Sequence, residues 1–270
     1  MKIATWNVNS IRARLPVALE WIDQAAPDVV LMQETKVLPE QFPAEPFEER
    51  GYNLAACGEA GGRSGVAILA KSPIEDVSEQ LPGDPDDQEA RYIEAVVRGV
   101  RVASVYVPNG TTVGSDRFAY KLDFLDRLRS HAAACLENDE SLVIGGDYNV
   151  APTPLDVYDA NALEGTICYH PDERAKLRAL LYLGLYDAYR IGEPRTAAYS
   201  WWHYQGRSWK ANQGLRIDHL LLSPQAADRL EGCAIDREVR GAKATSDHAP
   251  VWCRLSDERA RPTRNTLLRG

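Results

Sequence analysis

The sequence contains 270 residues, of which 44% are hydrophobic and 26% charged, and its formal net charge is −8. This composition is typical of a folded globular protein, and no apolar run approaches the ~20 residues of a transmembrane helix. The acidic balance excludes a protein that coats nucleic acid through general positive charge, so any contact with nucleic acid must be local.

The cysteines and the start of the chain indicate an intracellular, cytoplasmic protein. The five cysteines are odd in number, widely spaced and free of C-x-x-C pairs, which disfavours a disulfide framework or a zinc cluster. The residues after Met1 lack a signal-peptide layout. The length suits one large domain or two small ones, and we expect a single domain at residues 1–256 followed by a loose basic tail at 257–270.

The first 107 residues predict mainly strands. Residues 2–8 predict a strand, residues 15–25 an amphipathic helix with Pro16 in its first turn, and residues 28–33 a second strand. Residues 36–50 hold three prolines and predict an irregular connection. Two hairpins follow, one formed by residues 52–56 and 65–69 and the other by residues 91–97 and 100–107. The acidic run between them, at residues 75–89, is expected to form a solvated outer face.

Residues 116–136 form the clearest predicted helix, because Phe118, Leu122 and Leu125 recur at spacings of four and three. The uncharged run at 142–146 predicts a buried strand. The remaining segments are a loop at 151–165, a helix at 172–183, two segments flanking a polar loop (199–202 and 215–222) and two closing strands (234–239 and 251–255). Hairpins mixed with helical crossovers predict an α/β sandwich of two mixed β-sheets flanked by outer helices.

The run at 142–146 ends by presenting Asp147 and Asn149 on one side of the pleated backbone, after two glycines that permit close approach. A carboxylate at the end of a buried strand is costly unless a partner or a ligand compensates it. Six apolar segments carry such chemistry at one end: Asn7 and Asn9, Gln33 and Glu34, Tyr106 and Asn109, Asp147 and Asn149, Asp218 and His219, and Asp247 and His248. One such segment is ordinary, whereas six indicate a single site.

The acidic members of this set predict a metal ion. Glu34, Asp147, Asp218 and Asp247 cannot converge unpaired, because like charges at close range raise one another's pKa. Carboxylate and amide oxygens suit Mg²⁺ or Mn²⁺. The sequence has no H-E-x-x-H motif, so a zinc site of that kind is not expected.

These side chains together predict metal-assisted hydrolysis of a phosphate ester. Five of them can hydrogen-bond phosphate oxygens, namely Asn7, Asn109, Asn149, Tyr106 and His248. Asp147 is a candidate general base for water. An Asp218–His248 pair would orient the imidazole and favour its cation beside a developing negative charge.

Simpler interpretations exist for several of these residues. Asn7 alone fits a hydrogen bonder at a strand end, and Tyr106 alone fits a phenol at the rim of the core. Trp201 and Trp202 can stack on a base or sugar, or simply pack. The residues with only a structural interpretation are His131, His170 and His203 at the surface or in loops, and Trp6 and Trp252 in the core.

The ordered motifs between residue 2 and about 255 resemble those of the exonuclease III family of AP endonucleases. Those motifs are Trp6-Asn7-Val8-Asn9-Ser10-Ile11-Arg12, Gln33-Glu34-Thr35-Lys36, Tyr106-Val107-Pro108-Asn109-Gly110, Gly146-Asp147-Tyr148-Asn149, Gly214-Leu215-Arg216-Ile217-Asp218 and Ser246-Asp247-His248-Ala249-Pro250-Val251-Trp252. The resemblance implies a four-layer α/β sandwich shared with deoxyribonuclease I. It also implies Mg²⁺-dependent incision, with Mn²⁺ as a substitute, 5′ to abasic sites in duplex DNA. Related family activities are 3′→5′ exonuclease and removal of 3′-blocking groups, by an enzyme we expect to be a monomer.

The resemblance also assigns roles to individual residues. Metal ligation falls to Glu34 as the main ligand, with Asn7 and Asp247 beside it and Asp147, Asn149 and His248 at the same site. Asp147 would handle the proton of the water or of the leaving group, with Asn149 orienting it. Phosphate contact falls to His248, held by Asp218, and to Tyr106. The remaining assignments are DNA-backbone contacts from Arg12, Lys36, Arg91 and Asn109, and a pocket for a flipped-out sugar formed by Trp201, Leu215 and Ile217.

One segment departs from the family pattern. The loop at residues 203–213 has fewer arginines than we expect in bacterial members, which predicts weaker phosphate contact. The balance between exonuclease and abasic-site cleavage therefore stays open, as do the number of metal ions and whether Asp147 serves as base or acid.

Two other functions compete with a DNA-repair nuclease. A related phosphoesterase could act on phosphoinositide, sphingomyelin or RNA, but Arg91 and the residues Trp201, Leu215 and Ile217 favour DNA. A catalytically silent DNA-binding protein predicts erosion of the acidic set, which the sequence retains.

Overall fold

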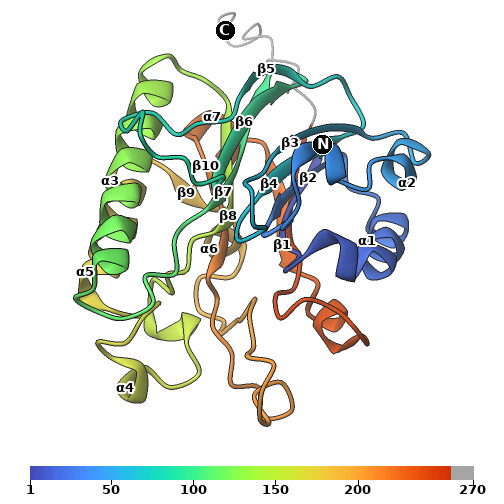
Figure 1. Cartoon of the computed structure of the whole chain (residues 1–270). Helices are drawn as coiled ribbons and strands as arrows, with labels where there is room; N and C mark the ends of the chain where they lie inside the picture. Colours follow the sequence, from blue (N-terminus) through green and yellow to red (C-terminus); the bar gives the residue numbers. More distant parts are fainter. Residues whose placement is uncertain (257–270) are drawn as a thin grey trace, which may run out of the picture.

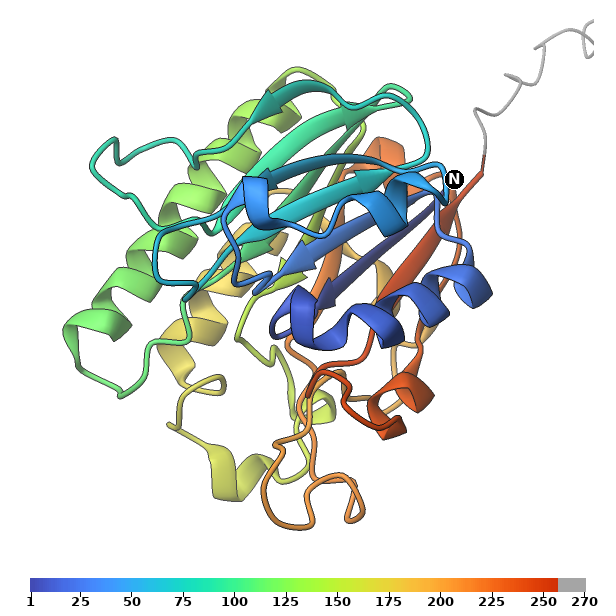
Figure 2. The ribbon, with the colours of Figure 1, turned by 45° about the vertical axis from the view of Figure 1, so that its right-hand side comes forward.

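The structure is a computed structural model that describes residues 1–256, so the tail predicted at 257–270 lies outside the described residues. Two six-stranded sheets pack face to face, and helices cover the outer side of each (Figure 1, Figure 2). Helix α1 (Ile11–Ala25) covers the first sheet, and helices α3 (Asp116–Glu137) and α5 (Pro171–Leu181) cover the second. The predicted four-layer α/β sandwich is confirmed.

The first sheet has the strand order β11–β12–β1–β2–β4–β3. Strands β1 and β2 are parallel and their neighbours are antiparallel, so the sheet is mixed. Its strands are β1 (Lys2–Asn7), β2 (Val29–Gln33), β3 (Asn53–Cys57), β4 (Val66–Ala70), β11 (Leu230–Ile235) and β12 (Val251–Leu255).

The second sheet has the order β5–β6–β7–β8–β10–β9, and its one parallel pair among the described strands is β7 with β8. Its strands are β5 (Glu75–Ser78), β6 (Tyr92–Val97), β7 (Val100–Tyr106), β8 (Leu142–Asp147), β9 (Tyr186–Asp187) and β10 (Asp218–Leu222). Short helical segments fill the connections: 3₁₀ turns Pro39–Gln41, Pro154–Asp156 and Arg237–Gly241, and helices α2 (Glu45–Glu48), α4 (Ala160–Leu163), α6 (Ala188–Gly192) and α7 (Pro224–Ala227).

Several predicted boundaries are wrong. Helix α1 begins at Ile11, so Pro16 lies inside the helix rather than in its first turn. Ile11 is fully buried and its N–H bonds the carbonyl of Thr35 at 3.1 Å, a contact across the fold that local sequence signals do not contain. Other boundaries differ too: residues 215–217 precede β10, β11 runs from Leu230 to Ile235 rather than over 234–239, and the acidic run contains edge strand β5.

The core between the sheets explains the uncharged strands. Ile3, Leu31, Val102, Val143 and Leu220 come from both sheets and are 0–1% exposed. A strand with apolar neighbours on both faces gains from apolar side chains at every position, so β8 shows no polar alternation. Among residues 1–256, no helix has the length and apolar character that crossing a bilayer requires.

Gly146 in β8 is required by the backbone of the neighbouring strand. A Cβ at this position would lie 1.9 Å from the carbonyl oxygen of Val105 and 2.6 Å from Val105 Cγ1. We expect Gly146→Ala to lower the free energy of unfolding by at least ~1–3 kcal/mol, because the strand must shift to avoid the overlap. Urea denaturation measures this loss. Gly192→Ala is the control, since a Cβ there meets nothing within 4 Å, and equal midpoints for the two variants would contradict the prediction.

Candidate active site

Strand register brings the polar strand ends to one edge of the sandwich. In the second sheet Asp147 pairs with Tyr106 of β7 on one side and with Asp218 of β10 on the other. In the first sheet Asn7 ends β1 beside Gln33, the last residue of β2. The two edges face each other, so the predicted side chains gather in one place.

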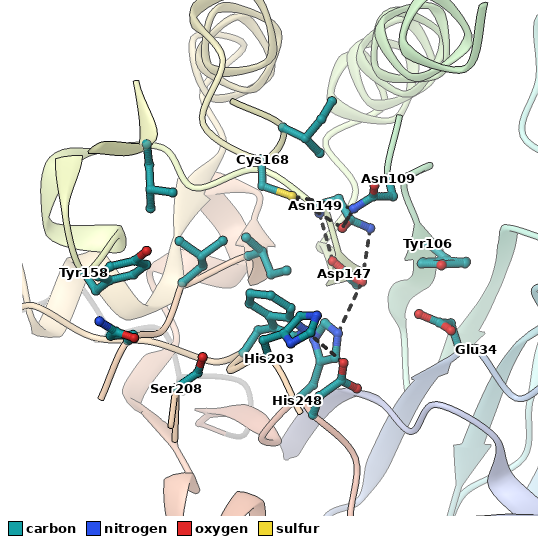
Figure 3. Close-up of a pocket in the computed structure, with 17 residues that line it drawn as sticks. Glu34, Tyr106, Asn109, Asp147, Asn149, Tyr158, Cys168, His203, Ser208 and His248 are labelled. Carbon is teal, nitrogen blue, oxygen red and sulfur yellow. Dashed lines mark hydrogen bonds and ion pairs between the residues drawn. The ribbon is translucent and has the colours of Figure 1, made fainter. Parts of the chain in front are cut away.

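The centre of the site is formed by Glu34, Asp147 and His248. Each offers a possible ligand atom, and these atoms all lie within 4.8 Å of one another. Asn7 joins the two sheets here, since its Nδ2 donates to Glu34 Oε1 at 2.8 Å and to Asp147 Oδ2 at 2.9 Å. Figure 3 shows Glu34 and Tyr106 facing Asp147 and His248 across the site. The acids predicted to converge from distant segments therefore do so.

Asp147 is a buried carboxyl group held by amides. Its Oδ1 accepts from the backbone N–H of Asn149 at 2.8 Å, and its Oδ2 accepts from Asn149 Nδ2 at 3.2 Å. Asn109 in turn donates to Asn149 Oδ1 at 3.0 Å. Burial raises the pKa of Asp147 to about 7, although the nearby charge of His248 opposes that shift. The group can therefore exchange a proton near neutral pH.

His248 is oriented by Asp218. The imidazole Nδ1 lies 2.9 Å from Asp218 Oδ2, which also accepts a 2.6 Å hydrogen bond from the Ser200 hydroxyl. The other ring nitrogen, Nε2, points toward Asp147 Oδ2 at 3.8 Å. Burial acts to lower the pKa of His248, but the carboxylates of Asp218 and Asp147 outweigh burial and raise it to about 10. The predicted pair thus presents a cationic donor to the site.

Asp247 lies at the pocket, beside this centre, and is held by other donors. Its carboxylate accepts from Asn9 Nδ2 and from the indole N–H of Trp201, both at 3.0 Å. Burial acts to raise the pKa of Asp247, but His248 and these two hydrogen bonds lower it overall. Asp247 therefore remains an anion beside His248.

Tyr106 forms the opposite side of the site. Its ring lies under the guanidinium of Arg91, 4.5 Å from the ring centroid, and only 9% of the residue is exposed. Burial and the carboxylates of Glu34 and Asp147 raise the pKa of Tyr106 well above its ordinary value. The phenol therefore stays protonated and can donate a hydrogen bond.

Several site residues adopt a left-handed backbone, Glu34 and Asn149 among them. Both have φ of +50°; Glu34 directly follows β2, and Asn149 is the second residue after β8. This conformation costs roughly 1–2 kcal/mol for a residue with a Cβ. Residues in such conformations gather at functional sites, where the surrounding contacts hold them in place.

A pocket of about 590 Å³ opens beside the carboxylates, and most of its far wall is apolar. The predicted residues Asn109, Trp201, Leu215 and Ile217 line it. Seven further lining residues were not predicted from the sequence: Tyr158, Leu163, Ile167, Cys168, His203, Ser208 and Gln213. They belong to loops and to α4, and no periodic pattern in the sequence predicts that they contact distant strand ends.

Three predicted DNA contacts lie outside the pocket. Lys36 is turned toward the site, where its Nζ lies 2.8 Å from Glu34 Oε2 and donates to Asn9. Arg12 is exposed and donates to the backbone of Gln41. Arg91 is 7% exposed and forms an ion pair with Glu89. Together with Arg63 and Arg117 it lines a second pocket.

The loop at 203–213 is anchored by Trp209. Its ring packs edge-on against Trp202, with centroids 4.9 Å apart, and lies 4.9 Å from the guanidinium of Arg237. Trp202 is fully buried, so packing is the correct one of its two interpretations. His203 was predicted as a surface or loop residue; it is exposed, yet it lines the pocket beside Trp201.

His131 was also predicted as a surface or loop residue, and this prediction is wrong. It lies in α3 with 16% of its side chain exposed and contacts Glu94 of β6 at 2.9 Å. The helix turns it toward the sheet, which an isolated histidine in a sequence does not reveal.

The donor set at the centre fits a hard divalent cation. Carboxylate oxygens of Glu34 and Asp147 lie close enough to share one ion, with the cationic His248 beside them. Asn7 donates a hydrogen bond to Glu34, and Lys36 forms an ion pair with it. These two contacts fix the orientation of the Glu34 carboxylate.

The chain matches the Endonuclease/Exonuclease/phosphatase family over residues 4–248. Exodeoxyribonuclease III of Haemophilus influenzae is 33% identical over 265 residues, covering 93% of this chain and 98% of that protein. The 3′–5′ exonuclease NExo of Neisseria meningitidis is 38% identical with a TM-score of 0.92, over 94% of this chain and 99% of its own. A NExo structure described as a 3′ phosphatase is bound to a product DNA hairpin.

An AP endonuclease of Archaeoglobus fulgidus is similar to the same degree, with 36% identity and a TM-score of 0.91 over 95% of this chain and all of its own. These matches extend over both sheets and every strand end that carries the site. The chain belongs to the endonuclease/exonuclease/phosphatase family and is an enzyme of its exodeoxyribonuclease III branch of DNA-repair nucleases.

Proposed function

We propose that this enzyme hydrolyses phosphodiesters in duplex DNA, using Mg²⁺ or Mn²⁺, on the 5′ side of abasic sites and at 3′ ends. The observation that carries the proposal is the convergence of Glu34, Asp147 and His248 within 4.8 Å beside a pocket with an apolar wall. Charged side chains on one side of the site and an apolar cavity on the other suit a phosphate attached to a sugar that has lost its base.

Glu34 is the main candidate to hold the metal ion, with Asn7, Asp147, Asn149, Asp247 and His248 around it. Bound Mg²⁺ supplies positive charge for a phosphate oxygen. Asn7 restrains Glu34 and Asp147 together through its two hydrogen bonds, and Asp247 adds a third carboxylate at the rim.

Asp147 is the candidate that removes the proton of the attacking water. Asn149 orients it through its backbone and side-chain N–H groups, and its raised pKa lies in the useful range for a base near neutral pH. His248, held by Asp218, donates to a phosphate oxygen, where its positive charge offsets the charge that develops on the phosphate. The hydroxyl of Tyr106 donates to the same phosphate.

The pocket is the candidate site for the extruded sugar. Trp201, Leu215 and Ile217 give it an apolar wall, which favours a deoxyribose without its base over a full nucleotide. Asn109 at the pocket, and Arg12, Lys36 and Arg91 outside it, are candidates for contact with the DNA backbone, which fixes the register of the duplex. We expect the enzyme to act as a monomer, with every residue proposed for the site supplied by a single chain.

Three labelled duplexes test the proposal: one with an internal abasic analogue, one with a 3′ phosphate and one with an unmodified recessed 3′ end. We expect Mg²⁺-dependent product from the first, with EDTA abolishing it, and product from at least one of the other two. Relative rates report the balance of activities. Intact duplexes alongside rapid hydrolysis of a phosphoinositide would refute the proposal.

A further inference from the structure

A second cluster of potential ligands lies on the outer face of the second sheet, where β6 meets α3. Glu94 points from β6 toward α3, and His131 and Cys135 extend from α3 toward it. None of the three lines the active-site pocket. The mechanism above uses none of them.

The three side chains have the spacing of a metal site. His131 and Cys135 are four residues apart and so share one face of the helix. His131 Nε2 lies 2.9 Å from Glu94 Oε2 and 3.8 Å from Cys135 Sγ, and one ligand atom from each residue lies within 4.8 Å of the others. Tetrahedral Zn²⁺ with ordinary bond lengths separates such ligands by roughly 3.3–3.7 Å. Shifts of well under 1 Å bring the 2.9 Å and 3.8 Å separations into that range.

The surroundings orient the carboxylate and exclude most of the solvent. Glu94 and Cys135 are each 6% exposed, while the side chain of His131 is 16% exposed and leaves an approach from outside. The Tyr92 hydroxyl donates to Glu94 Oε2 at 2.7 Å, and Arg101 lies 3.5 Å from Oε1. Groups behind a ligand in this way fix its direction toward a metal.

Arg101 places a positive charge near this cluster, but other acids share that charge. Its guanidinium also pairs with Asp76 and Glu140. Its contact with Glu94 is the longest of the three and involves the carboxylate oxygen that faces away from His131. The second oxygen, Oε2, accepts from the Tyr92 hydroxyl and faces the side where the thiol and the imidazole meet.

A hydrogen-bonded trio explains the arrangement less completely. The carboxylate oxygen of Glu94 and the sulfur of Cys135 both converge on a single nitrogen, His131 Nε2. That nitrogen carries one proton or one lone pair, so a proton can serve one of these neighbours well but not both. A divalent ion bound between the Glu94 oxygen, the His131 nitrogen and the Cys135 sulfur would contact all three ligand atoms at once.

We propose that Glu94, His131 and Cys135 bind a Zn²⁺ ion that ties α3 to β6, separately from the active site. A sulfur, nitrogen and oxygen donor set selects a borderline-soft ion such as Zn²⁺ rather than Mg²⁺. Binding requires the thiol to lose its proton, and the fourth position remains for a water molecule. The site has no C-x-x-C pattern, which is why a zinc cluster was not expected from the sequence.

Cobalt(II) titration of the metal-stripped full-length protein tests the proposal, because a thiolate bound to Co²⁺ gives a charge-transfer band in the near ultraviolet. We expect that band to saturate at one equivalent and to disappear in Cys135→Ser. Cys168→Ser is the matched control, since Cys168 is the thiol that lines the active-site pocket. No band in the wild-type protein, or a band lost in Cys168→Ser and kept in Cys135→Ser, would overturn the assignment.

Zinc binding and thermal melting provide a second test that does not depend on the cysteine variant folding. We expect His131→Ala and Glu94→Gln to weaken Zn²⁺ binding at this site at least about tenfold relative to Glu34→Gln, which alters the active site instead. Zn²⁺ should raise the melting temperature of the wild-type protein and of Glu34→Gln, but not of His131→Ala. A folded His131→Ala that binds and responds to Zn²⁺ as the wild-type protein does would also overturn it.

Discussion

Replacing Asp147 with asparagine is expected to slow cleavage of an abasic duplex by about 10²–10⁴-fold, the usual contribution of a general acid or base. The amide keeps the size of the carboxyl group but cannot take a proton from water. The remaining oxygen can still accept from the backbone N–H of Asn149, while the new NH2 group loses the hydrogen bonds that Asn7 and Asn149 donate to Oδ2. Single-turnover cleavage with excess enzyme measures the chemical step directly.

The same variant should fold normally. The pKa of Asp147 is raised to about 7 in the folded protein, above the ~3.9 of an unfolded chain. The folded state therefore binds the extra proton between about pH 4 and 7, and this carboxyl makes the wild-type protein less stable as the pH rises through that window. In metal-free buffer, Asp147→Asn should gain stability relative to the wild-type protein from pH 4 to pH 8.

A matched control for this prediction is Asp123→Asn, because the side chain of Asp123 is 63% exposed on α3. We expect the control to cleave at the wild-type rate. Near-wild-type cleavage by a folded Asp147→Asn would remove Asp147 from the mechanism.

Replacing Glu34 with glutamine is expected to raise the Mg²⁺ concentration needed for half-maximal activity at least about tenfold to a hundredfold. Losing a supporting contact alone has that effect at metal sites, and Glu34 is proposed as a ligand. The glutamine side chain loses the negative charge that Lys36 now pairs with at 2.8 Å. Activity measured across a Mg²⁺ titration should therefore show a partial recovery at high metal concentration.

Lys36→Met separates the loss of the ligand from the loss of the ion pair. That variant breaks the same pair but leaves the carboxylate intact, so it should bind Mg²⁺ no more weakly than the wild-type protein. If Glu34→Gln and Lys36→Met showed the same Mg²⁺ dependence as the wild-type protein, Glu34 would not be a metal ligand.

The architecture could be predicted because it depends on strong local patterns. The apolar run at 142–146 and the stripe of Phe118, Leu122 and Leu125 are visible in the sequence, and the structure contains both as β8 and α3. Polar residues directly after apolar strands were likewise sufficient to predict one site. Glu34, Asp147 and His248 lie together because the strand ends do.

The pocket wall and the second cluster depend on contacts between distant segments. Cys168 contacts Asn149 because the loop after β8 folds back toward the end of that strand. The backbone carbonyl of Cys168 accepts a hydrogen bond from the N–H of Ala151 at 2.7 Å. His131 faces Glu94 because α3 packs on β6 in a particular rotation. Neither fact follows from local propensity, since loops and helix orientation are set by tertiary packing.

The most direct test of the account is a crystal of the enzyme soaked with Mn²⁺ in the presence of duplex DNA carrying an abasic analogue. Anomalous scattering locates the ion without assumptions about its ligands. We predict a peak within ~2.0–2.6 Å of a Glu34 carboxylate oxygen, with a DNA phosphate as a shared ligand and the abasic sugar against Trp201. An ion bound away from Glu34 and Asp147, with the phosphate on another face of the protein, would contradict the account.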